Sequence, residues 1–69
     1  MEEYAVRLPI KLGQFVKLAN FAESGAHARE LIEIGEVMVN GEVETRRSHK
    51  LDDGDVVSVG DFSVRVSSV

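Results

Sequence analysis

The dipeptide Asn40-Gly41 constrains the fold of this 69-residue chain more than any other local feature. It joins two short segments with alternating valines, 37–39 and 42–44, and Asn-Gly is the strongest short-range signal for a β-hairpin because both residues tolerate positive φ. With a plain two-residue turn, Val43 would face away from the valines of the first strand. A bulge at Gly41 would bring them onto one face. We therefore expect a hairpin with a bulged turn.

Before the hairpin, apolar residues recur at the spacing of a helix instead of a strand. An apolar stripe predicts a helix over 12–20, and its members are Leu12, Phe15, Val16 and Ala19. Ser24 is a strong N-cap residue and predicts a second helix over 25–34. Gly35 stands where a left-handed C-terminal cap is expected. Two short helices should therefore meet through a tight connection.

Strand-like alternation also occurs at both ends of the chain. Together with the hairpin it predicts strands over 4–8, 37–39, 42–44, 56–59 and 62–67. We also expect Phe62 to lie in the core with Phe15 and Phe21. The fold class is then α+β, with two short helices packed on a small, mostly antiparallel sheet in a single domain over 1–69.

Composition limits what such a domain can do. Cysteine is absent, which points to a reducing cytoplasm and excludes cysteine-based zinc sites. No apolar run is long enough for a membrane span, and no phosphate-loop or nucleophile-elbow motif is present. A chain of this length builds one thin core and not a deep pocket. We expect a binding module and not an enzyme, with no cofactor, no metal and no membrane contact.

The charges are segregated along the sequence. The net charge is −4, from twelve acidic and eight basic residues. Two acid-free stretches, 11–20 and 46–50, hold five of the eight bases, which are Lys11, Lys17, Arg46, Arg47 and Lys50, and Arg29 lies between them. Such segregation can place a basic patch on an acidic body. Mixed charges that merely keep a small domain soluble are the alternative explanation.

The order of these pieces resembles the S4-type RNA-binding domain over about residues 8–59. The motifs that carry the resemblance are the Leu12-x-x-Phe15-Val16 stripe, the helix capped by Ser24, the Val37-x-Val39-Asn40-Gly41 hairpin and the Gly54-Asp55-Val56-Val57 segment. Each motif is weak alone, but their order is specific. The short length and the final strand are most similar to small stand-alone bacterial members of the YbcJ and YaaA type.

The resemblance implies binding of structured RNA through the two helices and the adjoining hairpin. The contact residues that it implies are Lys11, Gln14, Ser24, Gly25, His27, Arg29, Asn40 and Arg46, and the charge pattern adds Lys17, Arg47 and Lys50. The start of the second helix suits phosphate, because its backbone N–H groups are free and Gly25 leaves them uncovered. The expected partner is ribosomal or transfer RNA, bound by a monomer that acts alone or on a ribosomal particle.

Two further expectations follow from the same residues. Structured RNA should bind better than a single strand, because no pair of exposed aromatic residues is evident for stacking. Mild acid should strengthen binding by charging His27 and His49.

The alternative function is a protein-interaction domain or a ubiquitin-like carrier without RNA binding. Such carriers share similar Asn-Gly and Gly-Asp turns. They need a flexible Gly-Gly terminus for acyl activation, whereas this chain ends Val66-Ser67-Ser68-Val69.

Overall fold

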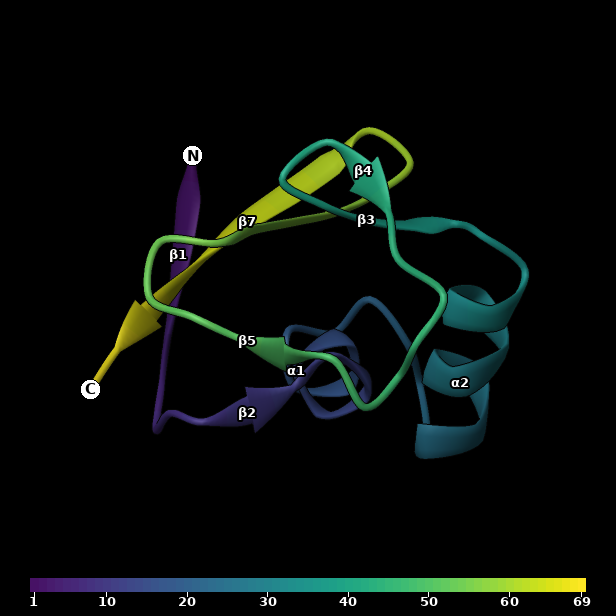
Figure 1. The fold of residues 1–69 in the computed structure, drawn as a ribbon, viewed down its shortest axis with the longest axis horizontal. Helices are drawn as coiled ribbons and strands as arrows, with labels where there is room; N and C mark the ends of the chain where they lie inside the picture. The colour runs from purple at the N-terminus through teal and green to yellow at the C-terminus, as the bar shows by residue number, and fades with distance from the viewer.

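Seven strands and two helices form two facing layers in the computed structural model, which describes all 69 residues (Figure 1). The helices are α1 (Leu12–Leu18) and α2 (Gly25–Glu33). The strands are β1 (Glu2–Val6), β2 (Ile10–Lys11), β3 (Val37–Val39), β4 (Glu42–Val43), β5 (Lys50–Leu51), β6 (Val56–Val59) and β7 (Phe62–Ser68).

Five of the strands form the main sheet, in the order β1-β7-β6-β3-β4. All neighbours are antiparallel except β1 and β7, which run parallel with Tyr4 opposite Val66. Strands β2 and β5 form a separate two-stranded ribbon beside α1, on the side of the core away from the main sheet (Figure 1). The α+β class, with two helices and a mostly antiparallel sheet, is confirmed.

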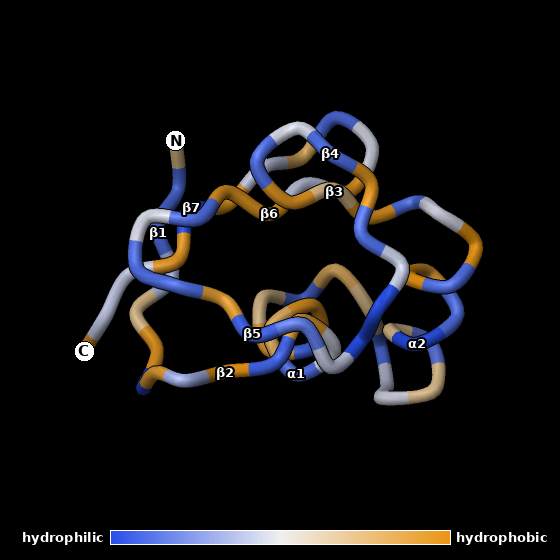
Figure 2. The backbone as a smooth tube through the Cα atoms, viewed as in Figure 1, coloured by the Kyte–Doolittle hydropathy of each residue, from blue (hydrophilic) through white to orange (hydrophobic).

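The core lies between the sheet and the layer that contains α1 (Figure 2). Phe15 is fully buried and meets the ring of Tyr4 edge to face, with 6.2 Å between ring centroids. The twelve buried residues are all apolar: Val6, Leu12, Phe15, Val16, Ala22, Ala28, Ile32, Val37, Leu51, Val57, Val64 and Val66. Ala22 lies in the connection between the helices, and the other eleven come from both helices and from five of the strands. The short elements therefore depend on one another for stability.

The helix ends follow from local backbone chemistry. Ser24 caps α2 as expected, and its Oγ accepts the backbone N–H of His27 at 3.1 Å. Gly35 adopts a φ of 86° at the other end of α2. Helix α1 stops at Leu18, earlier than expected, because Asn20 takes a positive φ of 65° and ends the helix as glycine commonly does.

The expectation of a bulged hairpin is wrong. Met38 pairs with Val43 and Val39 with Glu42, which is the register of a plain two-residue turn. Asn40 and Gly41 both adopt positive φ, at 53° and 83°, so the tight type I′ turn needs no extra residue. Val43 consequently leaves the core face and is 58% exposed.

Two other expectations also need correction, and one element was not predicted. Phe62 is not a core residue, because its side chain is 74% exposed. The first strand ends at Val6 and not at residue 8, since its pairing with β7 stops at Ser68. The ribbon of β2 and β5 was missed, because two-residue strands carry no periodicity.

The two helices, of seven and nine residues, are both too short to span a membrane.

Two isoleucines near the end of α2 test the placement of the core. Ile32 is fully buried, whereas Ile34 is 63% exposed. Replacing Ile32 with valine should lower the free energy of unfolding by about 0.5–1.5 kcal/mol, because a buried methylene is lost. The same substitution at Ile34 should change it by about 0.5 kcal/mol or less. Urea unfolding of both variants measures the difference, and equal losses would contradict this packing.

Candidate functional site

The basic connection between β4 and β5 is hydrogen-bonded to the start of α1. The N–H of Leu12 donates to the carbonyl of His49 at 2.8 Å, and the N–H of Gly13 donates to the carbonyl of Arg47 at 3.0 Å. The first N–H groups of a helix have no acceptor within the helix, so carbonyls from another segment satisfy them here. Pairing of Lys11 with Lys50 holds the same loop from its other end.

Gly13 lies in contact with Arg47. A Cβ at position 13 would lie 3.4 Å from Cβ of Arg47 and 3.5 Å from its carbonyl oxygen, which are ordinary van der Waals distances. The helix and the loop are therefore packed closely at this point.

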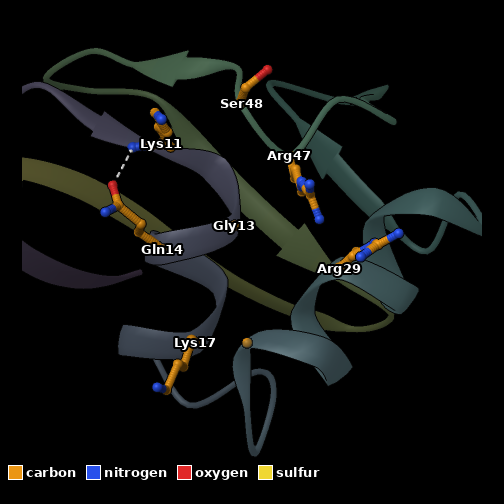
Figure 3. A pocket seen from close by; sticks show the side chains of 8 residues that line it. Lys11, Gly13, Gln14, Lys17, Arg29, Arg47 and Ser48 are labelled. Atoms are coloured by element: carbon orange, nitrogen blue, oxygen red, sulfur yellow. Dashed lines mark hydrogen bonds between the residues drawn. The ribbon is translucent and has the colours of Figure 1, made fainter.

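Between this loop and the two helices lies a shallow hollow of about 290 Å³, which we call the basic bowl (Figure 3). It is lined by Lys11, Gly13, Gln14, Lys17, Gly25, Arg29, Arg47 and Ser48. Four of these eight residues are cationic and none is acidic or apolar. Half of the basic residues of the chain thus line one hollow, while all twelve acidic residues lie outside its lining.

Most of these charges are not engaged within the protein. No carboxylate pairs with Lys11, Lys17 or Arg47. Nε of Arg29 lies 3.3 Å from Oε2 of Glu33, but both side chains are more than half exposed, so this pair contributes little stability. The side chain of Gln14 accepts the backbone N–H of Lys11 at 3.1 Å, as the dashed line in Figure 3 shows. The bowl can therefore attract an anion without breaking a strong internal contact.

The start of α2 contributes backbone to the bowl. Gly25 lines it, and nothing lies within 4 Å of where its Cβ would stand. Ser24 and His27 are near Gly25 in the sequence, and both form hydrogen bonds at the N-terminus of α2. His27 Nδ1 accepts the backbone N–H of Glu23 at 3.1 Å.

Arg46 is bound elsewhere. Its Nε and its backbone N–H both donate to Oε2 of Glu44 at 3.1 Å. The side-chain hydrogen bond from Arg46 is the main cause that lowers the pKa of Glu44 to about 2, and the backbone bond adds to it. The same contact raises the pKa of Arg46. Arg46 does not line the bowl, although it is adjacent to Arg47 in the sequence.

Asn40 also lies away from the bowl, in a hollow that holds four carboxylates. Its Nδ2 donates to Asp55 at 3.0 Å and its Oδ1 accepts the N–H of Val56 at 2.9 Å. These bonds tie the hairpin turn to the start of β6. The position suits a structural role more than contact with phosphate.

The structure therefore divides the residues singled out in the sequence. Those that line the bowl are Lys11, Gln14, Lys17, Gly25, Arg29 and Arg47. Ser24, His27 and Lys50 adjoin it in the chain, whereas Asn40 and Arg46 lie apart. Gly13 and Ser48 were missed, because neither carries charge and only the docked loop brings them together.

Neither histidine named in the expected gain of binding in mild acid lines the bowl, and that expectation stays a prediction. Nδ1 of His27 accepts the backbone N–H of Glu23 instead. Nδ1 of His49 lies 3.4 Å from Glu44 and the residue lines the acidic hollow, not the bowl.

Comparison with known proteins matches residues 6–67 to the model of the S4 domain. The chain belongs to the S4 domain family. This confirms the resemblance found in the sequence, and it extends the match to nearly the whole chain.

Individual relatives of this S4 domain are of similar length. It is 47% identical to the probable ribosome maturation protein RlbA of Bacillus subtilis, over 77% of this chain and 75% of that protein. It is 42% identical to the putative RNA-binding protein YbcJ of Escherichia coli, over 83% of this chain and 81% of that protein. The solution structure of YbcJ, described as revealing an ALFAL motif involved in RNA binding, superposes with a TM-score of 0.73 and 36% identity, over 97% of this chain and 87% of that one.

The contact between Glu44 and Arg46 predicts a pH-dependent contribution to stability. The folded pKa of Glu44 is about 2, below its ordinary value of 4.5, so the contribution is complete above about pH 4.5 and is lost as the pH falls toward 2. Glu44→Gln should lower the free energy of unfolding at pH 7, and the gap from the unmodified protein should close in acid. Urea unfolding at several pH values measures it, with Glu42→Gln as the control. A gap that stays constant from pH 7 to pH 2 would contradict the assignment.

Proposed function

We propose that this S4 domain is a non-catalytic RNA-binding module that holds the phosphate backbone of structured RNA in the basic bowl. The observation that carries the proposal is the composition of the bowl: four cations and no carboxylate, in a chain with a net charge of −4. Like charges around one hollow repel one another, so an anionic ligand that relieves this repulsion is favoured there.

The shape of the bowl favours a folded RNA over a flexible strand. Its groups come from three segments that are fixed to one another by backbone hydrogen bonds and core packing. Lysines supply point charges, arginines add bidentate contacts, and exposed N–H groups at the start of α2 add a third kind of phosphate donor. Such a fixed array recognises the spacing of phosphates in a structured backbone.

The named relatives support this assignment and its setting. YbcJ is described as an RNA-binding protein and RlbA as a ribosome maturation protein. We therefore propose ribosomal RNA, free or on a particle, as the partner of this chain, with the chain acting as a monomer in the cytoplasm. Transfer RNA is the alternative ligand, whose affinity is compared with that of ribosomal RNA in the binding test.

Two adjacent arginines provide a matched test of the bowl. Arg47→Ala should weaken binding of a folded RNA hairpin by about tenfold, because a charged contact to phosphate is lost. Arg46→Ala removes an equal charge one position away, from a side chain that is bound to Glu44 outside the bowl, and should have a much smaller effect. Filter binding with both variants measures this, after circular dichroism has confirmed folding. Equal losses of affinity in the two variants would mean that only the net charge matters, and would contradict RNA binding at the bowl.

The salt dependence of RNA affinity reports how many phosphates the bowl binds. With four cations at phosphates, the log–log slope of affinity against salt concentration should be about −3 to −4. Lys17→Gln should reduce the magnitude of this slope by about one. A slope near zero for a hairpin, or identical affinities for a hairpin and an unstructured strand of equal length, would overturn the proposed mode of binding.

A further inference from the structure

A third surface hollow, distinct from the basic bowl and from the acidic hollow around Asn40, lies beyond the end of α1. It has a volume of about 400 Å³ and we call it the apolar groove. Six apolar residues line it: Tyr4, Ala19, Phe21, Val59, Phe62 and Val64. None of them lines the bowl. The groove therefore calls for an explanation that RNA binding at the bowl does not supply.

The groove exists because the helical layer is shorter than the sheet. Phe62 shares the core-facing side of β7 with Val64 and Val66, which are both buried. Helix α1 ends at Leu18, however, and Asn20 turns the chain away with its positive φ. The sheet continues past this point and leaves Phe62 74% exposed on the face that is otherwise covered. Phe62 is the one strongly exposed apolar side chain of the groove, beside four half-buried neighbours, and it therefore offers a contact point for a partner.

The charges around the groove select the type of partner. Glu2 is the only charged residue in its lining, and Asp61 directly precedes Phe62 in the turn between β6 and β7. No lysine or arginine lines the groove. RNA phosphates would be repelled by these carboxylates, whereas lysine or arginine side chains would be attracted to them.

We propose that the apolar groove docks a basic protein segment, which inserts one aromatic or aliphatic side chain against Phe62 and sets its lysines or arginines beside Glu2 and Asp61. The volume is at the lower end of the roughly 300–1,000 Å³ typical of binding pockets, and therefore suits one or two side chains. A single buried anchor surrounded by polar contacts is the usual energetic arrangement of a protein interface. The proposal does not depend on RNA binding at the bowl, since the two surfaces share no lining residue.

Three synthetic peptides test the proposal by titration into ¹⁵N-labelled protein. The first has four lysines around one central leucine, the second replaces the leucine with serine, and the third replaces the lysines with glutamates. The first peptide should shift the amide signals of Val59, Phe62 and Val64 in a saturable way. The other two should bind at least about tenfold more weakly, because each lacks the anchor or the complementary charge.

One pair of variants and one double variant separate the contributions of the anchor and of the charges to peptide binding. Phe62→Ser should abolish the shifts, whereas Ile34→Ser, which removes another exposed apolar side chain at the end of α2, should leave them unchanged. The double charge reversal Glu2→Lys and Asp61→Lys should reverse the preference between the lysine and glutamate peptides. RNA affinity should not decrease in Phe62→Ser, which keeps this test separate from that of the bowl.

Four results would overturn the proposal. Equal binding of the leucine and serine peptides would mean that the groove holds no anchor. Equal binding of the lysine and glutamate peptides would mean that the carboxylates do not select a partner. Concentration-dependent shifts at Phe62 without peptide would identify a second copy of the chain as the occupant. Stronger shifts of the groove amides with an RNA hairpin than with the lysine peptide would identify RNA as the occupant.

Discussion

Two backbone hydrogen bonds from the start of α1, donated by Leu12 and Gly13, determine where the basic loop lies. Without them Arg47 would belong to a free connection between β4 and β5, and the lysines of α1 would stand on an ordinary solvated helix face. With them, the loop, α1 and the start of α2 share one hollow. Gly13 donates one of these bonds and packs against Arg47, so a residue with no functional group helps to position the proposed RNA-binding surface.

An acidic protein can present a basic surface because its charges are partitioned among structural elements. The acidic residues serve the fold at several points: Asp55 accepts the backbone N–H of Asp52, Asp53 accepts that of Ser68, and Glu44 binds Arg46. Most cations of the bowl have no such partner. The net charge of −4 is therefore a poor guide to the electrostatic potential at the bowl. The apolar groove, in contrast, has a carboxylate in its lining.

The sequence predicted the local elements well and their tertiary details less well. Periodicity and the Ser24 cap located both helices, and the Asn-Gly turn located the hairpin. The bulge was wrong because burial of Val43 was assumed, although a short edge strand can leave it exposed. Phe62 was misplaced for a related reason: alternation shows which face a residue shares, but not whether another layer extends far enough to cover it. The split between Arg46 and Arg47 depends on Glu44, which no local pattern reveals.

Amide hydrogen exchange at Leu12 and Gly13 tests the docked loop most directly. First-turn helix amides usually exchange fast, because they lack intrahelical acceptors. Here both donate to loop carbonyls, so they should be protected to a degree similar to amides of the central strand β6. The amides of Gly25 and Ala26, in the first turn of α2, have no acceptor and should exchange rapidly, which provides an internal control. Equally rapid exchange at Leu12 and Gly13 would show that the loop is not held against α1 and would contradict the account.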